Sequence, residues 1–70
     1  MHVDVNRLKG KTVEMGMNGE KLAKLLEIDQ STYYRKLGAD GTTFTLDQVF
    51  RITKALKLSR QEAVDIFLAQ

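Results

Sequence analysis

Seventy residues with no cysteine and no proline can form one small domain whose core must come from side-chain packing, because neither a disulfide nor a thiolate metal site is available. The formal charge of +2 at pH 7 allows a polyanionic partner without requiring one. No apolar run approaches the roughly 20 residues that a membrane-spanning helix needs, and the N-terminal segment lacks the apolar centre of a secretion signal. We therefore expect a cytoplasmic protein without a membrane segment.

A recurring helix-start pattern predicts five short helices. An apolar residue precedes a capping residue, and another apolar residue follows at the fourth helical position, as in a hydrophobic staple. The five occurrences are Val3, Asp4 and Leu8; Met17, Asn18 and Leu22; Ile28, Asp29 and Tyr33; Phe44, Thr45 and Val49; and Leu58, Ser59 and Ala63. No stretch shows convincing strand alternation, so residues 1–70 are expected to be a single all-α domain.

The outer helices should build much of the core. The first is expected over about Val5–Met15, with Gly16 as its left-handed C′ residue and Gly10 explained by close helix packing. The fourth should span Leu46 to about Leu56, and its inner side should hold Leu46, Val49, Phe50, Ile52 and Thr53. The fifth should begin at Arg60 and point Val64, Phe67 and Leu68 inward.

The prediction of function rests mainly on the stretch Asn18–Leu37. A helix over Gly19–Leu26 and a second over Gln30–Leu37 are separated by only about three residues, which is the spacing of a helix-turn-helix unit. In such a unit the second helix is offered to the major groove of DNA. Glu27, in the turn, must either adopt a left-handed conformation at some cost or change the turn.

Catalysis is poorly supported. The single histidine, His2, lies in a terminus that is expected to fray, and the carboxylates are scattered. Gly38 and Gly41 lack the spacing and the lysine of a phosphate-binding loop. We expect neither an enzyme nor a bound cofactor or metal.

The side of the predicted third helix opposite Tyr33 and Leu37 carries candidate base-reading residues, namely Gln30, Ser31, Tyr34 and Arg35. Glutamine can pair with adenine and arginine with guanine, whereas a tyrosine suits a sugar or phosphate contact. The simpler interpretation is a solvated helix side. An outward tyrosine beside an arginine favours a partner instead.

The segment GMNGEKLAKLLEIDQSTYYRKLG resembles the helix-turn-helix of the phage Cro and CI repressor family, the lambda-repressor-like domains. The residues that match or substitute conservatively are Gly16, Met17, Glu20, Leu22, Ala23, Leu26, Ile28, Ser31, Thr32 and Arg35. STYYRKL followed by FTLDQV is similar to small phage regulators of this group. The resemblance implies a compact five-helix domain that regulates transcription, with the third helix reading double-stranded operator DNA, usually as a homodimer on a palindromic site.

Three departures from the family pattern reduce the expected DNA affinity. Gly19 replaces a glutamine that commonly anchors a phosphate, Glu27 replaces the turn glycine, and the loop after the third helix has no lysine or arginine. The remaining candidates for backbone contacts are Asn18, Gly19, Lys21, Thr32, Lys36, Thr42 and Thr43.

Two further surfaces leave alternatives open. Arg51, Lys54 and Lys57 form a stripe that is expected to be solvated, with phosphate contact as the minority interpretation. Ile66 and Leu68 cannot both face inward with Val64 and Phe67, so one or both should form an apolar edge for self-association or a partner protein. The competing hypothesis, favoured by the balanced charges of the helix-turn-helix region and by Gly19 and Glu27, is a protein-binding module that keeps the repressor-like fold and pairs with a second regulator, as an antirepressor would.

Overall fold

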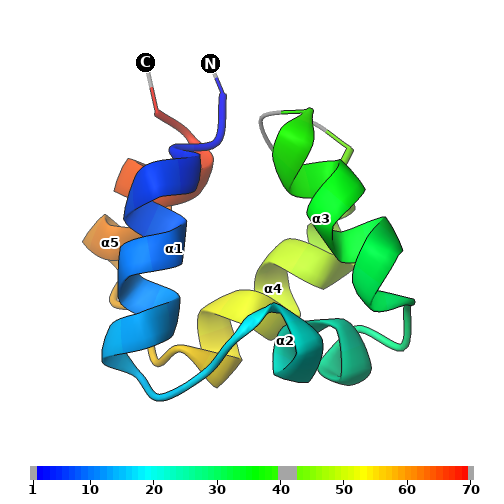
Figure 1. Cartoon of the computed structure of the whole chain (residues 1–70). Coiled ribbons are helices and arrows are strands. Elements are labelled where there is room, and N and C mark those ends of the chain that lie inside the picture. Colours follow the sequence, from blue (N-terminus) through cyan, green and yellow to red (C-terminus); the bar gives the residue numbers. More distant parts are fainter. Residues whose placement is uncertain (1, 40–42, 70) are drawn as a thin grey trace.

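The computed structural model describes residues 2–39 and 43–69. In that part the chain forms five helices: α1 (Val5–Glu14), α2 (Gly19–Leu25), α3 (Gln30–Gly38), α4 (Leu46–Ala55) and α5 (Arg60–Phe67). Figure 1 shows α1 and α5 side by side, with α4 running across from that pair towards α2 and α3. The prediction of an all-α domain is confirmed. All five helices begin at the predicted residues, and the first four end within one residue of the prediction.

Side-chain caps explain why the helix starts could be predicted so closely. Four of the five N-cap side chains accept a hydrogen bond from a backbone N–H at the start of the helix, which satisfies a donor that has no partner within the helix. Thr45 and Ser59 also complete capping boxes. The exception is Asp29, which lies at the N-cap position of α3 without a side-chain cap hydrogen bond. The four bonds join Asp4 to Arg7 N–H, Asn18 to Lys21 N–H, Thr45 to Gln48 N–H and Ser59 to Glu62 N–H.

Three of the connections between helices share one geometry, and we call them the matched links. In each, a residue with positive φ ends the helix: Gly16 at 70°, Glu27 at 59° and Lys57 at 52°. The next residue donates its N–H to a carbonyl of the last turn, which closes a Schellman motif. These bonds run from Met17 to Thr12, from Ile28 to Ala23 and from Leu58 to Thr53, at 2.9, 3.0 and 3.0 Å. Glu27 therefore adopts the left-handed conformation, the first of the two alternatives for the turn.

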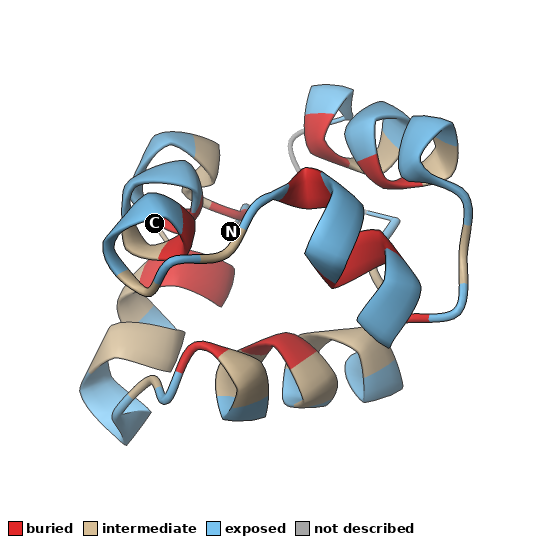
Figure 2. Ribbon diagram, turned by 60° about the horizontal axis from the view of Figure 1, so that its bottom comes forward, coloured by how far each residue is buried: buried red, intermediate tan, exposed pale blue. Residues whose placement is uncertain are grey.

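The core lies between all five helices. Its fully buried large side chains are Leu8, Leu22, Ile52, Leu56 and Ile66. Figure 2 shows the buried positions gathered on the helix sides that face one another, with exposed residues on the outside. Within the described ranges, no helix is long and apolar enough to cross a membrane.

Two predictions about the inner side of α4 are wrong. Leu46 is 89% exposed and Phe50 is 65% exposed. The core contacts run through Ile52 and Leu56, and Phe50 is two residues, or about 200°, away from Ile52 around the helix. Apolar residues cover so much of α4 that their spacing alone did not identify the inner side.

The C-terminal end also differs from expectation. Ile66, one of the two candidates for an exposed apolar edge, is 1% exposed, and Val64, expected to face inward, is 40% exposed. Leu68, the other candidate for that edge, is 46% exposed, so its expected inward orientation on the fifth helix is wrong. Ile66 is two residues, or about 200° around the helix, from both Val64 and Leu68, so when Ile66 faces the core the other two face outward. A backbone seam joins the ends of the described chain at this point: His2 and Ala69 exchange two hydrogen bonds of 2.9 Å, and Asp4 N–H donates to the Ile66 carbonyl at 2.7 Å.

Candidate functional site

The α2–α3 pair forms the centre of the candidate site. The two helices pack directly against each other, and the matched link through Glu27 connects them. Arg51 of α4 secures this link, because its guanidinium donates to the Leu25 carbonyl at 3.3 Å and lies 3.7 Å from the Glu27 carboxylate. Its Nε lies 3.0 Å from the Asp47 carboxylate. Arg51 thus connects α4 to the end of α2 and to the link that follows it. The prediction that Arg51 belongs to a solvated stripe did not include this role.

The outer side of α3 carries three of the candidate base-reading residues in the open. Gln30, Ser31 and Arg35 are exposed, whereas Tyr33 and Leu37 on the opposite side are 2% and 7% exposed. The buried pair fixes the rotation of α3 about its axis, so the polar side has to face outward. This is the orientation that the four-residue spacing of Tyr33 and Leu37 predicts.

Tyr34 takes a different position from the other three. It is half exposed, its ring meets that of Tyr33 edge-on with centroids 5.7 Å apart, and it lies across the start of α2. A Cβ added to Gly19 would lie 2.6 Å from the Tyr34 Cζ and 3.0 Å from its Cε1, which is closer than van der Waals contact allows. The missing side chain at Gly19 therefore makes room for the Tyr34 ring. The phenol of Tyr34 occupies the region where Asn18 and Gly19 were expected to meet a phosphate.

The remaining backbone-contact candidates are arranged around α3. Lys36 Nζ donates to the Thr43 carbonyl at 2.9 Å and lies 6.0 Å above the Phe44 ring, so this lysine is held against the segment that leads into α4. Lys21 and Thr43 are exposed, and Thr32 is partly buried. The side-chain oxygen of Asn18 is engaged as the cap of α2. Thr42 lies outside the described residues.

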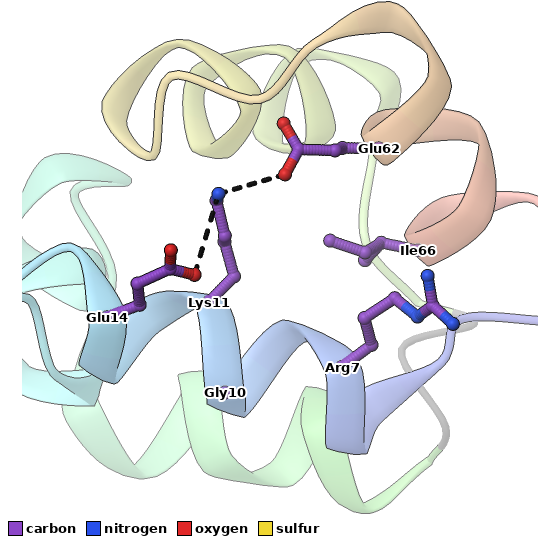
Figure 3. A pocket seen from close by; sticks show the side chains of 6 residues that line it. All are labelled: Arg7, Gly10, Lys11, Glu14, Glu62 and Ile66. Atoms are coloured by element: carbon purple, nitrogen blue, oxygen red, sulfur yellow. Dashed lines mark ion pairs between the residues drawn. The ribbon is translucent and has the colours of Figure 1, made fainter.

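A hollow between α1 and α5, away from the α2–α3 pair, has a structural explanation. A depression of about 440 Å³ lies between α1 and α5 (Figure 3), and its charged groups are paired. Lys11 Nζ lies 2.9 Å from Glu62 and 3.6 Å from Glu14. Gly10 borders this hollow, and a Cβ added there would meet nothing within 4 Å. The expectation that Gly10 is required by close helix packing is therefore wrong.

The pKa values of Glu62, Lys11 and Tyr33 are shifted by these contacts or by burial. The backbone N–H of Ser59 and the ammonium of Lys11 lower the pKa of Glu62 to about 2, and the Glu62 carboxylate in turn raises the pKa of Lys11. Burial raises the pKa of Tyr33 to about 12, with a smaller contribution from Tyr34. These groups serve packing and pairing. Among the described residues, no group of three or more His, Cys, Asp or Glu side chains is placed to hold a metal ion.

Comparisons with known proteins add no family to this description. No protein-family model matches the chain, and no curated protein or solved structure is found to be similar to it. The case for a function therefore depends on the geometry of α2, α3 and their surroundings.

Proposed function

We propose that this chain is a sequence-specific DNA-binding transcriptional regulator of the phage Cro and CI repressor type, acting in the bacterial cytoplasm, with α3 placed in the major groove. The observation that carries the proposal is the outer side of α3, where Gln30, Ser31 and Arg35 are exposed together on a helix whose opposite side is buried. A short link from α2 supports that helix, as DNA docking by a helix-turn-helix requires.

The exposed residues of α3 divide into two roles. Gln30 and Ser31 lie in the first turn, which approaches base edges most closely in this docking mode. Arg35 lies more than one turn further on and suits guanine O6 and N7. Each such bidentate contact discriminates against a wrong base by about 1–3 kcal/mol. Tyr34 belongs to α3, and its ring, which lies across the start of α2, fits a sugar or phosphate contact that positions the protein without reading sequence.

Regulation would proceed by occupancy of the operator. A homodimer would place its two α3 helices in successive major grooves of a palindromic site, about one helical turn apart. Bound in this way, the protein excludes or recruits polymerase. Few cations surround α3, so the non-specific, salt-dependent part of the affinity should be small.

The test is selection of binding sites from a pool of random DNA duplexes at low salt, with Arg35→Ala compared against wild type. Arg35→Ala should lose preference at one base position in each half-site. Binding of the homodimer to the wild-type site should weaken about a hundredfold, because two base contacts of roughly 1.4 kcal/mol each are lost. Arg60→Ala is the matched control, because it removes the same charge from an exposed position on α5. An unchanged selected sequence with Arg35→Ala, or no duplex binding even at low salt, would contradict the proposal.

The competing function is a protein-binding module that pairs with a second regulator. Two observations favour it: the exposed carboxylate of Glu27 in the link before α3, and the exposed apolar side chains Leu46 and Phe50 on α4. Binding of duplex DNA that appears only after a second regulator protein is added would support this alternative. Binding of duplex DNA by the purified chain alone would support the DNA-reading function.

A further inference from the structure

The exposed side of α4 is unusually apolar for a surface without a partner. Leu46 and Phe50 are four residues apart and lie on neighbouring turns of the same side, 89% and 65% exposed. Lys54 Nζ lies 5.9 Å above the Phe50 ring, and Asp47 completes the same surface one turn before Phe50. We call these four residues the α4 outer face. Exposed apolar patches with polar residues around them commonly mark interaction sites.

The two charged residues of this face, Asp47 and Lys54, are arranged so that they match a second copy of the same face. Asp47 and Lys54 are seven residues apart, which is about two turns or 10.5 Å along the helix, with Phe50 between them. If a second α4 packs antiparallel about a two-fold axis near Phe50, each Asp47 lies opposite the Lys54 of the other copy. Parallel packing would instead bring Asp47 to Asp47 and Lys54 to Lys54. The face is therefore complementary to itself, as an interface with two-fold symmetry requires.

We propose that a second copy of this chain docks on the α4 outer face, with the two α4 helices antiparallel and the Phe50 rings at the centre. The proposal assigns a surface to the homodimer of the proposed function, but its evidence comes from the residues of α4 alone. The carboxylate of Asp47, 70% exposed, makes the face a poor match for DNA phosphates. The area is small, so we expect a weak dimer with a dissociation constant on the order of 0.1 mM in the absence of DNA.

Charge exchange tests the pairing directly. In sedimentation equilibrium without DNA, Asp47→Lys and Lys54→Asp should each weaken self-association about tenfold, because each places like charges opposite one another in both symmetric contacts. An equimolar mixture of the two variants should recover the wild-type association, since every contact in the mixed dimer joins a lysine to an aspartate. The doubly exchanged variant should also recover it.

Controls separate the interface from folding. Asp47 contacts Arg51 and lies in the first turn of α4, so Asp47→Lys also lowers monomer stability; thermal melts at low concentration measure that effect. Phe50→Ser should fold normally and remain monomeric, whereas Lys9→Asp, at an exposed position on α1, should dimerise like wild type. The proposal is overturned if wild type stays monomeric up to millimolar concentration, or if the mixture associates no better than its components.

The two proposals fail in different ways. A dimer that obeys the charge exchange and binds no duplex would refute the DNA function alone. A monomer that selects a DNA sequence through Arg35 would refute the α4 interface and the homodimeric arrangement on the operator, but not base reading by α3.

Discussion

The contact between Gly19 and Tyr34 leads to the sharpest stability prediction. In Gly19→Ala the new Cβ overlaps the Tyr34 ring, with distances of 2.6 Å to Cζ and 3.0 Å to Cε1. The ring is half exposed and can swing outward, so the helix start survives. The tyrosine loses its place over α2 and its edge-on contact with Tyr33.

The magnitude follows from two opposing contributions. An alanine in place of a helical glycine stabilises the folded state by at most about 0.5–1 kcal/mol. Displacing Tyr34 gives up an aromatic pair worth about 0.5–1.5 kcal/mol, together with the area that the ring covers. We therefore expect Gly19→Ala to destabilise the wild type by up to about 1 kcal/mol. In a Tyr34→Ala background, where nothing is displaced, the same change should be neutral or stabilising.

Urea unfolding of the four proteins of this double-mutant cycle measures the coupling, which should be about 1 kcal/mol. Such a difference corresponds to roughly 4–8 °C in the melting temperature of a domain this small. The same change in both backgrounds would refute the contact between Gly19 and Tyr34.

Three other predictions concern the core, the matched links and the α1–α5 hollow. Leu22→Ala should cost about 2–5 kcal/mol, whereas Phe50→Ala should alter monomer stability by less than about 0.5 kcal/mol. A loss of about 3 kcal/mol or more for Phe50→Ala, measured by urea unfolding in dilute solution, would show that Phe50 belongs to the core. Glu27→Gly and Lys57→Gly should each raise stability by up to about 1 kcal/mol. A residue with a side chain costs about 1–2 kcal/mol in the left-handed conformation, and the greater freedom of glycine in the unfolded chain cancels part of the stability gained by removing that cost. Unchanged melting temperatures for both variants would contradict this prediction. The pKa of Glu62 is lowered to about 2 in the folded state. The ionised Glu62 carboxylate therefore stabilises the folded state fully above its pKa in the unfolded chain, about 4.3, and this stabilisation is lost as the pH falls towards 2. The stability advantage of wild type over Glu62→Gln should therefore shrink over that range in thermal melts, and a difference independent of pH would exclude this role.

The helix starts were predictable because their signals are local. A capping side chain and the backbone N–H that it binds are only three residues apart, so Thr45 and Ser59 mark the starts of α4 and α5 without tertiary information. Which side of α4 faces inward is not local. Leu46 and Phe50 have the same apolar character as Ile52, and only the placement of the other helices decides which of them is covered.

The candidate site was predictable to a similar extent. Tyr33 and Leu37 set the rotation of α3 and hence the exposure of Arg35, all within one helix. The position of Tyr34 depends on Gly19, fifteen positions earlier, and a glycine offers no side-chain pattern to signal the contact. The i,i+4 spacing of Asp47 and Arg51 was visible in the sequence, whereas the hydrogen bond from Arg51 to α2 required the fold.

The backbone seam between the ends of the described chain has a consequence for the order of folding. The matched links join helices that are neighbours in sequence, whereas the seam must bring together opposite ends of the described chain, which costs the most chain entropy. The ion pairs that join α1 to α5 beside the seam, from Arg7 to Asp65 and from Lys11 to Glu62, are partly solvated and add little stability. The seam should therefore close last and open first. A partly opened molecule would expose Ile66 to water while α3, still packed on α2, continued to present Arg35.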